Sequence, residues 1–326
     1  MSVDLGKRKT DSNATPLSSS ALPDLHFPFS HALDLLARQV VEGFIVGRHR
    51  SPFHGFSAEF SDYRQYNTGE STRHIDWPLY ARTDKLFVKQ FEEETNLRCQ
   101  LLIDHSGSML FPVEGMGDVD HPNKLTFSVC AAAVLIEILH RQRDAFGLSL
   151  ISNGIDLQTP CRSSGVHQRY LLGLLAHLIQ SKENHGPETH LAEALHLTAE
   201  SLHRRSLVVI FSDAFLPDSE RDDLFDALRH LRHNKHEVIL FHTLDRSHEV
   251  DLAYDNRPYR FIDLETGTQA NLRPNLFAQE YARQMNAQVS ELQHRAMQYK
   301  IDYVPVDVAD GFQQTILPFL LRRSKL

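Results

Sequence analysis

The chain has 326 residues, 41% of them hydrophobic and 23% charged. This composition is ordinary for a protein of two domains, or of one large domain with an appendage, and it excludes a fibrous or wholly disordered chain. Lys and Arg number 34 against 42 Asp and Glu, a net charge of −8, so the chain lacks the positive field of a dedicated nucleic-acid-binding protein.

Residues 1–24 are rich in Ser, Thr, Asn and Pro without apolar periodicity, and we predict a disordered tail. No apolar core follows its basic patch, so it does not read as a secretory signal. No apolar run in the chain approaches the roughly 18 residues that a membrane span needs. We therefore expect a cytoplasmic protein without a transmembrane segment, while peripheral association with a membrane through a partner stays open.

Residues 25–95 are predicted to form a helix followed by a small β-rich module. Over 30–46, apolar residues recur at helical spacing: Leu33, Leu36, Val40 and Phe44. The segment 47–95 is dense in aromatic residues, glycine and charges of both signs. Alternating residues near its end, Leu86 and Val88 among them, indicate β structure.

Residues 96–326 alternate between apolar strands and amphipathic helices. Strands are expected at 98–104, 146–151, 155–159, 206–213, 236–244 and 301–306, helices at 124–142, 167–180, 190–203, 219–233, 276–299 and 312–323, and a hairpin at 259–272. This alternation predicts an α/β fold with a doubly wound, mostly parallel sheet that is covered on both faces.

Oxygen-bearing side chains gather where the predicted strands end. Asp104, Ser106 and Ser108 follow the first strand, Asp213 follows the strand at 206–213, and Thr189 precedes a helix. Ligands of open parallel sheets bind beyond the carboxyl ends of the strands. Carboxylates and hydroxyls suit Mg²⁺, Mn²⁺ or Ca²⁺ rather than zinc or copper. We favour a metal site over the alternative, a polar loop in which a serine merely caps a turn.

The same five residues resemble the metal-ion-dependent adhesion site of von Willebrand factor A domains, and every position matches. The resemblance implies a doubly wound sheet with a divalent cation, such as Mg²⁺, at its carboxyl edge. It also implies that Ser106, Ser108 and Thr189 ligate the cation directly, and that Asp104 and Asp213 do so directly or through water.

A second pattern resembles the domain-of-unknown-function 58 (DUF58) family, bacterial proteins with von Willebrand A-like domains. It reads Gly55-x-x-x-Glu59-Phe60-x-Asp62-x-Arg64-x-Tyr66-x-x-Gly69-Glu70-x-x-Arg73-x-Ile75-Asp76-Trp77, then Tyr80-Ala81-Arg82 and Leu86-x-Val88-Lys89-x-Phe91-x-x-Glu94. Members are often encoded beside MoxR-type AAA+ ATPases, which implies such an ATPase as a partner. Many members begin with two membrane spans, and this chain resembles a subtype without them.

Arginines are concentrated in the same segment, where Arg64, Arg73 and Arg82 lie among acidic residues that include Asp76. They could form a partner site, or an ion network that holds the small module against the sheet domain. We favour the network because opposite charges nearly balance. Trp77 is expected to pack between the two modules.

Twenty histidines raise the alternative of a zinc or nickel site. His230, His233 and His236 are spaced by three, but no carboxylate or thiol partner is evident beside them. We predict a solvated helix face instead. The ring of His105 is expected to point away from the cation.

Three functions are compatible with the sequence. The favoured one is a binding module in which the cation captures an acidic side chain of a partner, and which serves as an adaptor for a MoxR-type ATPase acting on an unidentified client. The alternative is a metal-dependent hydrolase using the same carboxylates and His105, although the chain has no P-loop, Gly-x-Ser-x-Gly or His-Glu-x-x-His string. The third is a scaffold with an empty site.

Overall fold

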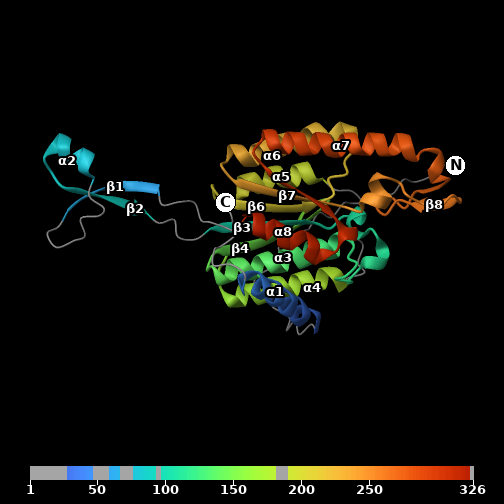
Figure 1. Cartoon of the computed structure of the whole chain (residues 1–326), viewed down its shortest axis with the longest axis horizontal. Helices are drawn as coiled ribbons and strands as arrows, with labels where there is room; N and C mark the ends of the chain where they lie inside the picture. The colour runs from blue at the N-terminus through green and yellow to red at the C-terminus, as the bar shows by residue number, and fades with distance from the viewer. Residues whose placement is uncertain (1–27, 47–58, 67–75, 93–96, 181–189, 324–326) are drawn as a thin grey trace, which may run out of the picture.

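A computed structural model describes residues 28–46, 59–66, 76–92, 97–180 and 190–323 (Figure 1). The predicted disordered tail, 1–24, lies outside the described residues.

A six-stranded sheet forms the centre of the fold, with strand order β10-β7-β6-β3-β4-β5. All neighbouring strands are parallel except β4 and β5, which are antiparallel. This confirms the predicted α/β class and mostly parallel sheet. The strands are β3 (Arg98–Asp104), β4 (Ala145–Ser152), β5 (Gly154–Gln158), β6 (Leu207–Ser212), β7 (Glu237–Leu244) and β10 (Asp302–Asp307).

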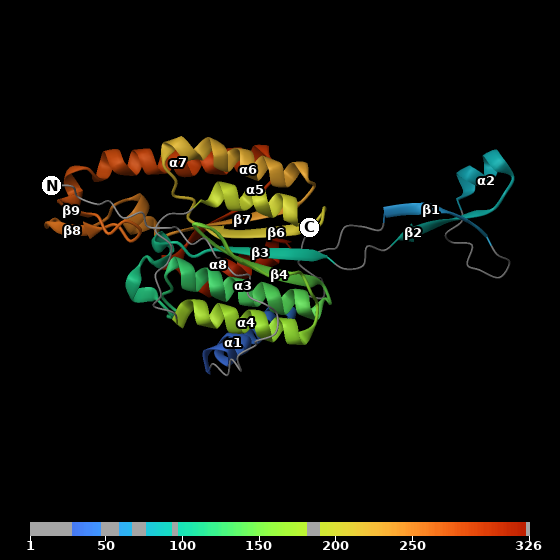
Figure 2. The ribbon, with the colours of Figure 1, turned by 180° about the vertical axis from the view of Figure 1, so that it is seen from behind.

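Helices cover both faces of the sheet, as Figures 1 and 2 show from opposite sides. One face carries α1 (Pro28–Val46), α3 (Lys124–Arg141), α4 (Gly165–Gln180) and α8 (Phe312–Arg323). The other carries α5 (Leu191–Ser201), α6 (Arg221–His233) and α7 (Ala278–Gln298). Two hydrophobic cores result, one on each face, which is why the central strands are continuously apolar.

Helix α1 confirms the helix predicted over 30–46. Its apolar stripe, which includes Leu33, Ala37 and Val41, is buried in the same core as α3 and α4. From the sequence, we predicted that this helix belongs with the β-rich segment that follows it. In the structure it packs on the sheet domain, where its apolar face is buried.

The β-rich segment contains a helix as well as strands. Strands β1 (Glu59–Gln65) and β2 (Phe87–Glu92) pair antiparallel, and α2 (Trp77–Thr83) lies between them in the chain. Helix α2 begins where it does because Asp76 Oδ1 accepts the N–H of Leu79 at 3.0 Å. Periodicity misses this helix because seven residues are too few to show a 3.6-residue repeat. Trp77 is 56% exposed, so the prediction that it packs between the modules is wrong.

Strands β8 (Tyr259–Ile262) and β9 (Gln269–Leu272) form the predicted hairpin. Its tip is held by Asp263, whose Oδ1 accepts the N–H groups of Glu265 and Thr266 at 2.8 and 3.2 Å. Figures 1 and 2 show this hairpin at the end of the sheet where β3 and β6 terminate.

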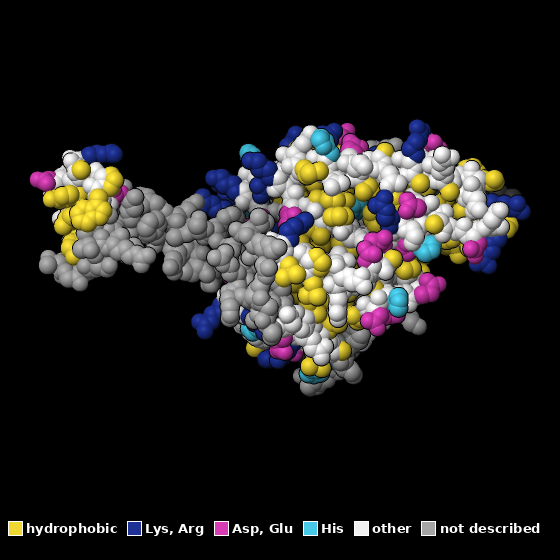
Figure 3. Space-filling view, viewed as in Figure 1, with side chains coloured by type: hydrophobic (Ala, Val, Ile, Leu, Met, Phe, Trp, Pro, Cys, Tyr) yellow, Lys and Arg dark blue, Asp and Glu magenta, His cyan; other side chains and the backbone are white. Residues whose placement is uncertain are grey.

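Charges of both signs are interspersed on the face shown in Figure 3. Within the described ranges, no helix is long and apolar enough to cross a bilayer.

The carboxyl group of Asp144 gives the fold a testable pH dependence. It is buried beside β3 and accepts the N–H of Leu97 at 3.0 Å. Burial raises its pKa from 3.8 to about 6, although the Leu97 N–H opposes the rise. Between these two values the folded state holds a proton that the unfolded state has lost, so this group reduces stability progressively as the pH rises through that window.

We therefore expect Asp144→Asn to gain about 2 kcal/mol of stability relative to the wild type when the pH is raised from 4 to 7. Urea unfolding of both proteins at several pH values measures this difference. The exposed Asp226→Asn variant is the control. A difference that does not change with pH would refute the prediction.

Candidate functional site

The candidate site lies at the point where the chain changes direction through the sheet. Strands β3 and β6 are neighbours, but β4 follows on one side of them and β7 on the other. At such a switch point the loops after the two strands diverge and leave a crevice. Asp104 is the last residue of β3, and Asp213 comes directly after β6.

Asp104 is buried, with 2% exposure. Its Oδ1 accepts the N–H of Ser106 at 3.0 Å, and its Oδ2 accepts the hydroxyl of Ser212 at 2.7 Å. Burial and then the charge of Asp213 raise the pKa of Asp104 to about 6, while the bonds from Ser106 and Ser212 lower it. Two carboxylates therefore repel each other in a region screened from water.

Two hydroxyls stand beside these carboxylates. Ser106 is buried and immediately precedes the short 3₁₀ helix η2 (Gly107–Leu110), on which Ser108 lies. Their Oγ atoms are 3.1 Å apart. The structure therefore brings these two predicted hydroxyl ligands together. Thr189, the third predicted hydroxyl ligand, lies outside the described residues.

Lys124 is a component of the site that the sequence analysis missed. It begins α3, is fully buried, and its Nζ lies 2.7 Å from Asp213 Oδ2. The same ammonium lies 2.5 Å from Glu249 Oε1 on a short π-helical turn, η5 (Arg246–Val250). Desolvation lowers the pKa of Lys124, but Asp213 and Glu249 outweigh it, so the pKa is raised and the ammonium stays charged.

Glu249 is the third carboxyl group of this cluster. Its Oε2 accepts the N–H of Asp245 at 2.8 Å, and burial raises its pKa to about 7 despite the attraction of Lys124. One signal in the sequence could have revealed Lys124: it is a lone cation at the start of the run 124–139, which is mostly apolar and therefore expected to be buried. Buried lysines are rare without an acidic partner.

The residues present fit a hard divalent cation. Three carboxylates, Asp104, Asp213 and Glu249, and one ammonium, Lys124, carry a net charge of −2 when all are ionised. A divalent cation would balance that charge, and the serine hydroxyls offer oxygen ligands. In the part of the chain that the structure describes, no three His, Cys, Asp or Glu side chains form a metal cluster by themselves, so such a site would depend on hydroxyls.

The predicted ion network of the upstream segment is placed only in part. Asp76 caps α2, and Arg82 is exposed in the last turn of that helix. Arg64 lies in β1 opposite Val88, and Arg73 lies outside the described residues. The network therefore stays a prediction.

The histidines considered as metal ligands contact different partners. His105 Nε2 lies 2.8 Å from Asp156 Oδ2 on β5. His230 Nδ1 lies 3.0 Å from His196 Nδ1 on α5, and His236 is fully buried after the end of α6. On α6, His233 is exposed and His230 is partly buried, whereas His236 lies beyond the helix where the chain turns into β7 and its ring is buried.

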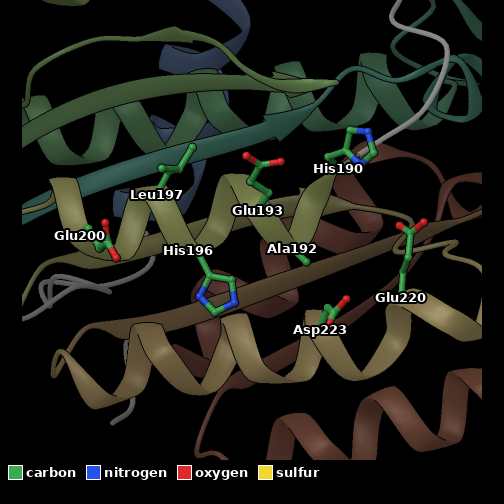
Figure 4. Close-up of a pocket in the computed structure, with 8 residues that line it drawn as sticks. All are labelled: His190, Ala192, Glu193, His196, Leu197, Glu200, Glu220 and Asp223. Atoms are coloured by element: carbon green, nitrogen blue, oxygen red, sulfur yellow. The ribbon is translucent and has the colours of Figure 1, made fainter.

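A surface pocket of about 450 Å³ lies between α5 and α6 (Figure 4). Figure 4 shows the ring of His196 pointing from α5 toward α6. Four carboxyl side chains line the pocket: Glu193, Glu200, Glu220 and Asp223. Their charge makes this surface unsuited to a phosphate backbone.

Comparison with known proteins gives one family match. The family model described as "Protein of unknown function DUF58" matches residues 62–291. The uncharacterized protein Mb1516 of Mycobacterium bovis is 28% identical over 216 residues, which are 65% of this chain and 63% of that protein. The chain thus spans less than two thirds of that relative.

Solved structures give weaker similarities. The conserved hypothetical protein BatB of Bacteroides thetaiotaomicron aligns over 71% of this chain and 100% of its own, with a TM-score of 0.42 and 16% identity. A von Willebrand factor type A protein of Catenulispora acidiphila aligns over 49% of this chain and 34% of its own, with a TM-score of 0.30 and 11% identity.

Proposed function

Because this chain belongs to the DUF58 family, whose model matches residues 62–291 and whose description specifies no activity, we propose a function from the chemistry of its site. The chain is a divalent-cation-dependent protein-binding module that captures a carboxylate of a partner at the edge formed by β3 and β6. Mg²⁺ is the cation proposed, with Mn²⁺ or Ca²⁺ as substitutes.

One observation carries this proposal: the buried carboxylates of Asp104 and Asp213 repel each other at the edge where Ser106 and Ser108 pair their hydroxyls. Repelling buried carboxylates are unfavourable in a fold unless a cation or a proton compensates them. Lys124 compensates Asp213 in part. The remaining negative charge favours a further cation at this edge.

The chain's own residues have distinct roles in this proposal. A bound divalent cation would supply an electrophilic centre with exchangeable water positions. Ser106 and Ser108 would hold it through their hydroxyls, and Thr189 is proposed as the third hydroxyl. Asp104 orients the loop by accepting the Ser106 N–H at 3.0 Å. Lys124 fixes Asp213 and limits the excess negative charge that an acidic partner would meet.

A MoxR-type AAA+ ATPase is the proposed partner, with an unidentified acidic client, and the cytoplasm is the proposed location. The support for the ATPase is the family membership, because members of this family are often encoded beside ATPases of that type. The hydrolase alternative is less favoured because the chain has no P-loop, Gly-x-Ser-x-Gly or His-Glu-x-x-His string.

Capture of a purified MoxR-type ATPase from the same organism by the immobilised chain tests this function. We expect capture in Mg²⁺ to fall at least about tenfold with EDTA or in Asp104→Ala, because a direct or water-bridged ligand is lost. Asp226→Ala, at an exposed site on α6, should capture like the wild type. Undiminished capture by Asp104→Ala, or capture that EDTA does not affect, would contradict the proposal.

A further inference from the structure

The tip of the β8–β9 hairpin packs directly on the loop that carries the candidate ligands. A Cβ atom added at Gly107 would lie 2.6 Å from the carbonyl oxygen of Leu264 and 3.2 Å from Cγ of Glu265. Gly107 sits between Ser106 and Ser108, so only the absence of a side chain there permits this approach. The hairpin tip therefore covers the edge of the sheet at the serine pair.

At this tip the apolar side chains are exposed and an acidic side chain is partly buried, the reverse of the usual arrangement. Among residues 262–270, Glu265 alone is partly buried, while Ile262 and Leu264 are 47% and 41% exposed. A glutamate normally stays in water and a leucine leaves it. The inward position of Glu265 therefore needs an attractive group on the surface that it faces.

The groups that Glu265 faces are polar or acidic. Ser108 interacts with its carboxylate through the hydroxyl and the backbone N–H, whereas Asp213 and Asp104 act on it with like charge. Burial and that repulsion raise the pKa of Glu265. A carboxylate that two others repel is stabilised by a cation bound nearby.

We infer that Glu265 is an intramolecular ligand of the cation, so that the hairpin occupies the coordination position at which a partner's carboxylate binds. This inference rests on the proposed function, since it requires the cation. Its consequence is that a partner must displace the Glu265 carboxylate, and with it the hairpin tip, from the serine pair. The outward-facing Ile262 and Leu264 then move with the tip.

Binding of Mn²⁺ to the full chain tests the inference with two readouts, the dissociation constant and the water-proton relaxation per bound Mn²⁺. We expect Glu265→Gln to weaken Mn²⁺ binding about tenfold, because an anionic ligand is lost. Relaxation per bound ion should rise, because water enters the vacated position. Asp255→Asn, at an exposed position that precedes the hairpin, should match the wild type in both readouts.

The outcomes separate the two claims. If wild type binds Mn²⁺, Ser106→Ala weakens that binding, and Glu265→Gln equals the wild type in affinity and relaxation, the inference is refuted and the proposed function stands. If the wild type binds no Mn²⁺, both are refuted. If Glu265→Gln binds Mn²⁺ more weakly and shows increased relaxation per bound ion, while Asp255→Asn matches the wild type, the inference and the proposed function are both supported.

Discussion

Replacing Lys124 by methionine should destabilise the chain by about 3–5 kcal/mol in the absence of divalent cations. Methionine keeps most of the volume but removes the ammonium that lies 2.7 Å from Asp213 and 2.5 Å from Glu249. Both carboxylates then remain buried beside Asp104 without their counter-ion. Lysine at this position is thus a structural cation for the acidic cluster, not a ligand of the proposed metal.

Urea unfolding at pH 8 in EDTA measures this effect, because at that pH Glu249 of the wild type, with a pKa of about 7, is mostly ionised and pairs with the ammonium. The exposed Lys85→Met variant is the control. We expect Mg²⁺ to reduce the destabilisation of Lys124→Met, since a cation at the edge compensates the same carboxylates. A loss no larger than that of the control would show that the ammonium is not needed.

Removing both hydroxyls, in Ser106→Ala with Ser108→Ala, should weaken Mn²⁺ binding by at least about a hundredfold. Each change removes a direct oxygen ligand, whereas even indirect ligand contacts are worth 10–100-fold. Stability in EDTA should fall by about 2–4 kcal/mol, because the hydroxyl of Ser106 also bonds Asp104 and that of Ser108 also bonds Glu265. Isothermal titration with Mn²⁺ measures the affinity.

The matched control is Ser290→Ala, which removes an exposed serine hydroxyl bonded to its own helix. It should bind Mn²⁺ like the wild type. Equal affinity in the double variant and the control would exclude the serine pair as ligands. A loss of stability in EDTA well beyond about 4 kcal/mol would instead assign the pair a chiefly structural role.

The strands and helices of the sheet domain are readable in the sequence because each carries a regular apolar pattern. The strand predicted at 206–213 is apolar at every position from 207 to 211, since helices cover both faces of the sheet. Helices such as 167–180 show a 3.6-residue repeat. The same patterns locate the strand ends, which is why Asp104 and Asp213 were predicted to meet at one edge of the sheet, as they do.

The remainder of the site depends on contacts between distant segments. Lys124 and Glu249 are 125 residues apart, and Glu265 reaches Ser108 only because the hairpin packs on Gly107. No local pattern encodes such approaches. Likewise, the capping role of Asp76 is not visible in the sequence, because only the short helix that follows it identifies the cap.

The most direct test of the cation site is thermal unfolding of the wild-type chain in EDTA, followed by titration with Mg²⁺ or Mn²⁺, with Asp104→Ala alongside. A cation that binds only the folded state stabilises it by about 2.7 kcal/mol at a hundredfold excess over its dissociation constant. We predict a saturable rise in the melting temperature of the wild type that Asp104→Ala lacks. Equal melting temperatures with and without cation in the wild type would contradict the account.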